Sequence, residues 1–150
     1  MPTLDDVGRI AADLPGSVAK VTPYGSTWLV RNKAYAWESH PWPSEAEHIR
    51  ELVSRELCVG LKVPDDDTKQ ALVQGWPDTF VVSETSWGGP RVIVRMERVD
   101  DDLLRELVID AWRTEAPKYL RRQYDDEHPV DGTGADVMGA GEEARDGDLE

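Results

Sequence analysis

The sequence has little cysteine, no long apolar run and no excess of basic residues, and each absence excludes a class of protein. The single cysteine, Cys58, excludes an internal disulfide and a zinc site built from several cysteines. No apolar run approaches the roughly 18 residues of a membrane-spanning helix. Residues 1–9 also lack the basic start and apolar stretch of a signal peptide. We therefore expect a soluble, cytoplasmic protein without a membrane partner.

The charge balance is strongly acidic. The 150 residues include 30 Asp and Glu against 17 Lys and Arg, which gives a formal net charge of -13. A uniformly basic nucleic-acid-binding protein is therefore excluded. Much of the excess lies in residues 125–150, where Arg145 is the only base and no aromatic Phe, Trp or Tyr occurs. Because such a segment buries too little apolar surface to offset its ordering entropy, we expect one domain at 1–124 and a disordered acidic tail at 125–150.

Hydrophobic periodicity and capping residues predict the elements of the domain. The predicted helices span about residues 4–14, 65–75 and 101–116, with Thr3 and Asp100 as N-caps and a further turn or two after Pro117. The predicted strands span about residues 28–31, 34–37, 58–63, 79–83 and 91–96, with Asn32-Lys33 as the turn of the first hairpin. The order, a helix, three strands, a helix, two strands and a helix, predicts an α+β domain of two layers with an antiparallel sheet.

One further segment lies outside that order. His40-Pro41-Trp42-Pro43 is a stiff break, and Ser44 and Glu47 then have the spacing of a capping box. Apolar residues recur at helical spacing through Leu57. We therefore expect an inserted helix near 44–57. Because strand 91–96 has apolar residues on both faces, the insert or a partner chain is expected to cover the second face of the sheet.

The candidate catalytic and metal-ligating groups have no diagnostic spacing. His40 and His48 do not form the His-Glu-x-x-His pattern that places two histidines on one helix face. The aspartate triplets at 65–67 and 100–102 precede apolar helical segments, so capping explains them. Cys58 is expected to be a small buried thiol. We therefore predict no enzymatic activity and no metal site.

Two hairpin tips with adjacent cations are the remaining candidate site. Arginine and lysine at projecting hairpins contact phosphates, and an aromatic ring stacks on a base or lies against a sugar. The predicted nucleic-acid-binding residues are Arg31, Lys33, Trp87 and Arg91, with Arg95, Lys118, Arg121 and Arg122 as a flank. The alternative is that these cations are ordinary solvated loop charges; if they form a site, its predicted partner is DNA.

The ordered set of segments resembles the MmcQ/YjbR-like family over about residues 4–124. The matching stretches are YGSTWLVRNKAYAWES, CVGLKV and SWGGPRVIVRMERVDDDLLRELVIDAWRTEAPKYL. The resemblance implies an α+β layer similar to secretion-chaperone and frataxin-like architectures, no enzymatic activity or cofactor, and DNA binding by the paired hairpins. The Trp-Gly-x-Pro typical of the family is Pro23-Tyr24-Gly25-Ser26 here, so this loop is expected to differ.

Protein binding is the alternative function. Apolar residues on both faces of the sheet would bind a second copy of the chain or another protein if the insert left one face exposed. The surface around the hairpins distinguishes the two functions. A continuous positive stripe favours nucleic acid, whereas an apolar patch rimmed by tryptophan favours a protein or another ligand.

Overall fold

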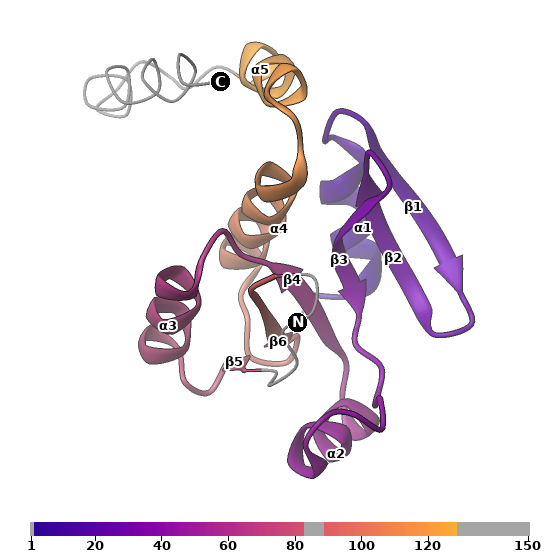
Figure 1. Ribbon diagram of the computed structural model, residues 1–150, viewed down its shortest axis with the longest axis vertical. Coiled ribbons are helices and arrows are strands. Elements are labelled where there is room, and N and C mark those ends of the chain that lie inside the picture. The colour runs from indigo at the N-terminus through magenta and orange to yellow at the C-terminus, as the bar shows by residue number, and fades with distance from the viewer. Residues whose placement is uncertain (1, 83–88, 129–150) are drawn as a thin grey trace. The chain divides into compact units, whose positions relative to one another are not determined.

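The computed structural model describes residues 2–82 and 89–128, which divide into two compact units after Glu115. Of the elements described, the first unit contains the six strands and four of the five helices (Figure 1). In chain order its elements are α1 (Leu4–Ala12), β1 (Ser17–Thr22), β2 (Gly25–Val30), β3 (Lys33–Glu38), α2 (Glu47–Arg55), β4 (Cys58–Lys62), α3 (Asp66–Gly75), β5 (Phe80–Val81), β6 (Arg91–Arg95) and α4 (Asp101–Glu115). The predicted α+β class is confirmed.

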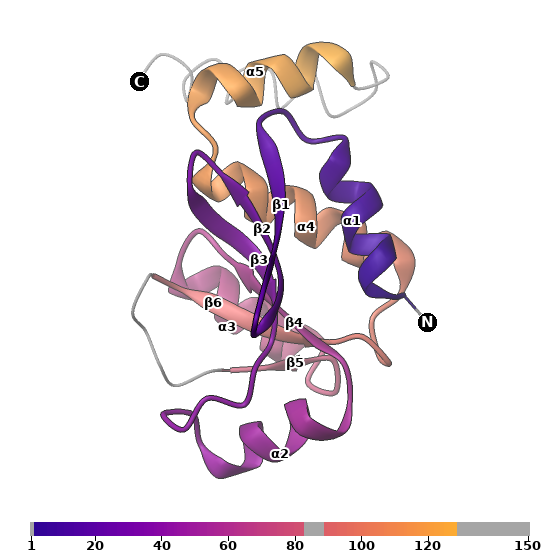
Figure 2. The same cartoon turned by 90° about the vertical axis from the view of Figure 1, so that its right-hand side faces the viewer.

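The strands form one antiparallel sheet in the order β1-β2-β3-β4-β6-β5. Helices α1 and α4 pack together on one face, where α4 contacts β2, β3 and β4 (Figure 2). We call this the inner face and the opposite one the outer face. Strand β1 was not predicted. It is an edge strand whose four central residues are exposed, so its sequence carries no alternation of buried and exposed positions.

The core lies between the inner face and the two helices. Alternate residues of β4 and β6, among them Val59 and Val94, are fully buried. Trp112 of α4 is fully buried as well, as predicted from its place on the apolar stripe. Its indole Nε1 donates a hydrogen bond to the Pro15 carbonyl oxygen at 3.0 Å, so the one polar atom of this large ring is satisfied where water is excluded.

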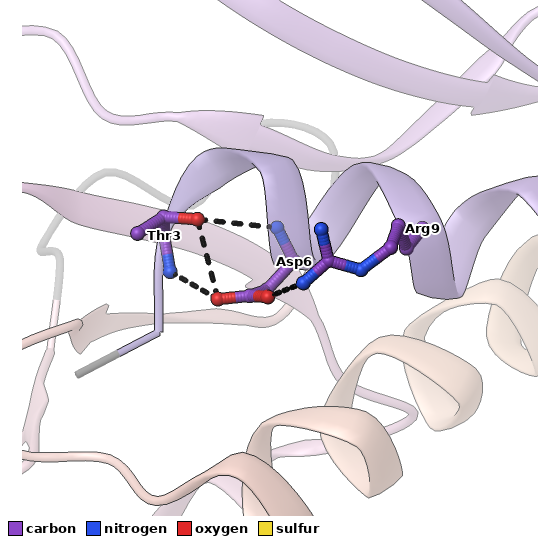
Figure 3. Close-up of polar contacts among 3 residues, drawn as sticks. All are labelled: Thr3, Asp6 and Arg9. Carbon is purple, nitrogen blue, oxygen red and sulfur yellow. Dashed lines mark hydrogen bonds and ion pairs between the residues drawn. The ribbon is translucent and has the colours of Figure 1, made fainter.

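The predicted caps of α1 and α4 are confirmed. Figure 3 shows the cap of α1, where the Asp6 amide donates to Thr3 Oγ1 at 3.3 Å and the Thr3 amide donates to Asp6 Oδ2 at 2.7 Å. Asp6 also forms an ion pair with Arg9. At the start of α4, the Leu103 amide donates to Asp100 Oδ1 at 2.7 Å. Such bonds satisfy amides that have no partner within the helix, and each stabilises the helix by about 1 kcal/mol.

The insert forms α2, which is shorter than the predicted helix. The expected capping box of Ser44 and Glu47 is wrong, because Ala46 is the N-cap and no side chain bonds there. Arg50 instead ties the preceding break to the helix, since its Nη1 donates to the carbonyl oxygens of Pro43 and Glu45 at 3.2 and 2.5 Å. The apolar residues of α2 pack on the outer face, as predicted. The buried cluster consists of Ile49, Leu52, Cys58 and Ile93.

The turn between β2 and β3 lies one residue earlier than predicted. Arg31 and Asn32 have φ of 53° and 66°, and β3 already begins at Lys33. Two successive positive φ angles are typical of a type I′ turn, whose twist matches that of the flanking strands. The hairpin tip therefore consists of Arg31 and Asn32, and Lys33 belongs to the strand.

In the second unit, α5 (Lys118–Glu127) follows Pro117, which is the N-cap of the helix. Arg121 Nη1 donates to the Ala116 carbonyl oxygen at 3.3 Å. The helix includes residues 125–127, which the sequence analysis assigned to the acidic tail, and the rest of that tail from residue 129 lies outside the described residues. No helix among the residues described is long and apolar enough to cross a membrane.

Candidate functional site

The structure places the predicted nucleic-acid-binding residues in different surroundings. Arg31 and Lys33 are exposed at and beside the β2–β3 tip. Arg91 is 9% exposed at the start of β6. Trp87 lies outside the described residues, while strands β5 and β6 of its hairpin pair as predicted. Three of the flanking cations, Lys118, Arg121 and Arg122, lie on α5 in the second unit.

Arg95 holds the sheet to the end of α2. Its Nε and Nη2 donate to the two carboxylate oxygens of Glu56 at 2.8 and 3.0 Å, and its Nη1 donates to the Asp78 carbonyl oxygen at 3.2 Å. The hydrogen bonds from Arg95 lower the pKa of the Glu56 carboxyl. This paired geometry is the strong form of an ion pair, and it gives Arg95 a structural role.

A cleft of about 830 Å³ lies on the outer face of the first unit. Its floor is formed by β2, β3, β4 and β6, and one wall is formed by the segment 39–46 and α2. The lining residues are Thr22, Tyr24, Thr27, Lys33, Ala34, Trp37, Glu38, Ser39, His40, Trp42, Ser44, Glu45, Ile49, Val53, Lys62, Arg91, Ile93 and Glu115. Only Lys33 and Arg91 among them were predicted site residues.

The floor of the cleft is set by the close approach of Trp37 to Gly60. These residues pair across β3 and β4, and Gly60 pairs in turn with Ile93 of β6. A Cβ atom at Gly60 would collide with the indole nitrogen of Trp37. Glycine inside a strand often marks such an approach, so the Gly60 of the matching stretch CVGLKV was a usable signal for this floor.

Three aromatic rings form a cluster at one border of the cleft. The ring centroids of Tyr24, His40 and Trp42 lie 4.5 to 5.0 Å apart, and the rings are tilted against one another. Tyr24 is 52% exposed and Trp42 is 39% exposed. Tyr24 comes from the loop that was expected to differ, and the other two come from the predicted break. The border of the cleft therefore contains partly exposed aromatic rings.

The opposite part of the cleft contains two cations on adjacent strands. Lys62 and Arg91 pair directly across β4 and β6. Lys62 Nζ lies 3.4 Å from Glu115 Oε2, and the Lys62 side chain is 14% exposed. The Arg91 guanidinium carbon lies 5.8 Å from the centre of the Trp37 ring. Burial lowers the pKa of Arg91, and the negative charge of Glu45 opposes that shift.

Cys58 is a buried thiol, as predicted. It is 2% exposed beneath α2, and burial raises its pKa to about 12. A thiol with this pKa stays protonated at neutral pH and is a poor nucleophile. Within residues 2–82 and 89–128, no three His, Cys, Asp or Glu side chains gather in a group that would hold a metal ion.

Comparison with known proteins identifies relatives along most of the chain. The YjbR family model matches residues 12–114. Uncharacterised proteins of Mycobacterium bovis and Mycobacterium tuberculosis are 34% identical over 123 residues, which cover 80% of this chain and 93% of each relative. The crystal structure of a Deinococcus radiodurans protein with a DUF419 domain has a TM-score of 0.58 and 19% identity, and covers 88% of this chain and 94% of that one. Apart from Glu115, every residue that lines the cleft falls within the matched range.

Proposed function

The chain belongs to the YjbR family, and we propose that it is a non-enzymatic binding domain whose ligand enters the cleft on the outer face of the sheet. The observation that carries this proposal is the composition of the lining. Apolar atoms form most of the lining surface, and six charged residues are distributed around it. A volume of about 830 Å³ is also within the range of roughly 300–1,000 Å³ that small-ligand sites occupy.

The charges in the cleft support a ligand with a mixed surface. Three cations line it, and so do three carboxylates. The cations are Lys33, Lys62 and Arg91, and the carboxylates are Glu38, Glu45 and Glu115. Duplex DNA binds best to a surface of one sign, because neutralised phosphates supply much of the affinity. The cleft is therefore better suited to a compact organic ligand than to a duplex.

Filling the cleft tests the proposal. Four small aromatic probes, benzyl alcohol, benzylamine, phenylacetate and phenyl phosphate, are titrated while the amide resonances of Trp37 and Ile93 are followed by NMR. We expect at least one probe to shift these resonances. Thr27→Tyr places a ring on the outer face opposite Trp37 and should abolish the shifts.

The matched control is Val18→Tyr, which places the same ring on β1 outside the cleft lining. It should leave probe binding unchanged. If no probe shifts Trp37 and Ile93, or if Thr27→Tyr binds as well as the parent protein, the proposal is wrong.

DNA binding through the hairpin tips is the second candidate function. The exposed Arg31 at the β2–β3 tip and the exposed Lys33 beside it favour this function. On this proposal, Arg31→Gln should weaken binding to a labelled duplex at low salt and reduce the salt dependence. Arg31 does not line the cleft, so this variant should leave the aromatic probes unaffected. A duplex that binds equally to the parent and Arg31→Gln would remove the hairpin-tip function.

The acidic tail offers a further test of the DNA function. If the tail competes with phosphate for these cations, removal of residues 129–150 should strengthen duplex binding, most clearly at low salt. The full-length and shortened proteins are compared by fluorescence anisotropy at low and physiological salt. The absence of binding by the shortened protein at low salt would leave the cleft as the sole proposed site.

A further inference from the structure

Lys62 and Arg91 are arranged in a way that sheet stability disfavours. They are direct cross-strand partners on β4 and β6, and both side chains line the outer-face cleft. Side chains at such positions have Cβ atoms only about 4.5–5.5 Å apart, and like charges placed there repel. The alternate residues of the same two strands are apolar and buried. Sheet stability therefore does not explain why two cations are neighbours at this place.

Burial adds to the cost of this arrangement. Arg91 is 9% exposed and the Lys62 side chain 14% exposed, although both residue types are almost always at the surface. Carboxylates reduce the cost from two directions, Glu115 beside Lys62 and Glu45 acting on Arg91. The site therefore brings two cations and two carboxylates together where little solvent reaches the cations.

The two carboxylates are held differently. Glu115 is the last residue of α4, a helix that packs on the inner face of the sheet. Glu45 lies in the segment between β3 and α2, outside any helix or strand. A side chain on such a segment moves at a lower cost than one on a packed helix. Arg50 holds the backbone carbonyl oxygen of Glu45, but the Glu45 carboxylate is the one of the two that does not lie on a packed helix. It is therefore the carboxylate that a ligand displaces more readily.

We propose that the ligand of this cleft is a small amphipathic organic anion. Its carboxylate or phosphate binds between Lys62 and Arg91 in place of the Glu45 carboxylate, and its apolar body lies on Trp37 and Ile93 towards the aromatic cluster. This inference rests on the proposed function of the cleft. Arginine presents a fork of N–H donors that matches either anion, and Lys33 at the same cleft supplies a third positive charge for a doubly charged phosphate.

The test compares ligands that differ in one group. Phenylacetate and phenyl phosphate carry the two anions on the same ring, benzyl alcohol is the neutral analogue, and inorganic phosphate is the anion without the ring. Dissociation constants are measured by NMR titration. At least one of the ring-bearing anions should bind about ten-fold more tightly than benzyl alcohol, and inorganic phosphate should bind more weakly than phenyl phosphate. The stronger of the two ring-bearing anions identifies the ligand as a carboxylate or a phosphate.

Substitutions should change anion affinity in opposite directions. Arg91→Gln and Lys62→Gln should each lower the affinity for the preferred anion about ten-fold or more. Glu45→Gln should raise that affinity several-fold, because it removes the competing carboxylate. Glu47→Gln, which changes the charge of the same insert outside the cleft lining, should have no effect. None of these variants should alter the affinity for benzyl alcohol by more than about two-fold. If Arg91→Gln does not fold, Glu45→Gln and Lys62→Gln still decide the matter.

Two outcomes separate this inference from the proposed function. The anion site is wrong if benzyl alcohol binds in the cleft as tightly as both anions. It is also wrong if Glu45→Gln lowers the affinity for the preferred anion or leaves it unchanged. In either case the cleft remains a binding site. If Thr27→Tyr blocks the binding of none of the probes, the proposed function of the cleft itself is wrong.

Discussion

The two faces of the sheet are formed by the same strands but differ in how completely other elements cover them. On the inner face, residues such as Val59 and Val94 are fully buried under α4. On the outer face, α2 covers Cys58 and Ile93, while the neighbouring positions Lys62 and Arg91 line a cleft. One face is therefore closed by packing and the other only in part. The comparison shows that the insert makes the site as well as covering the sheet, because it supplies one wall of the cleft.

The largest effect is expected from a cavity on the inner face. Trp112→Ala removes a fully buried ring and leaves the Pro15 carbonyl oxygen without its donor. The free energy of unfolding should fall by about 3–5 kcal/mol. Denaturant unfolding followed by circular dichroism measures this change. A loss below about 1 kcal/mol would contradict the place of Trp112 in the core.

A cavity under the insert should lower the free energy of unfolding less than a cavity under α4 does. Ile49 is buried between α2 and the outer face, so Ile49→Ala should destabilise the protein by about 2–3 kcal/mol. Its loosened helix should also expose apolar surface, which a hydrophobic dye detects. If the variant is as stable as the parent and binds no more dye, α2 does not close this part of the outer face.

Adding one methyl group to the cleft floor tests the contact between Trp37 and Gly60. Gly60→Ala forces the Trp37 ring to move and should cost about 1–3 kcal/mol through overpacking. Trp37→Leu in the same chain should relieve the clash, so the double variant should be more stable than Gly60→Ala alone. The single and double variants form a double-mutant cycle, which denaturant unfolding measures. If the losses in unfolding free energy are additive, the ring and the glycine do not interact.

The smallest expected effect concerns the ion pair at the end of α2. Arg95 lowers the pKa of Glu56, so the pair stabilises the folded state above the unfolded pKa and loses that contribution as pH falls through the folded pKa. At pH 7, Glu56→Gln should cost about 1 kcal/mol. The difference between parent and variant should shrink as the pH falls below 4.5, the ordinary pKa of a glutamate side chain. A difference that stays constant from pH 7 to strongly acidic pH would contradict this role.

Local chemistry made much of the fold predictable from the sequence. Thr3 and Asp100 cap the helices they were expected to cap, and the apolar stripe of α4 placed Trp112 correctly. Strand β1 was missed because an edge strand exposed along its centre lacks the pattern on which prediction depends. The turn at Arg31 was displaced because spacing alone does not show which residues adopt positive φ.

The candidate site was harder to predict, because it depends on register between distant segments. Lys62 and Arg91 meet only through the pairing of β4 with β6, and Trp37 meets Gly60 only through the pairing of β3 with β4. Cations beside a glycine-rich turn suggested hairpin tips, whereas the structure directs Arg91 into the cleft. Sequence periodicity gives the face of a residue but not its cross-strand neighbour.

The exposed edge at β1 also has a consequence for motion in the protein. An edge strand with exposed central residues has few buried contacts, and such elements open at low free energy and exchange their amide hydrogens early. Tyr24 lies in the turn that joins β1 to β2 and packs against His40 and Trp42. Fraying of β1 therefore loosens the aromatic border first, while Lys62 and Arg91 stay paired with each other across the inner strands β4 and β6. On the proposed function, the border would adapt to ligands of different length without disturbing the charged end.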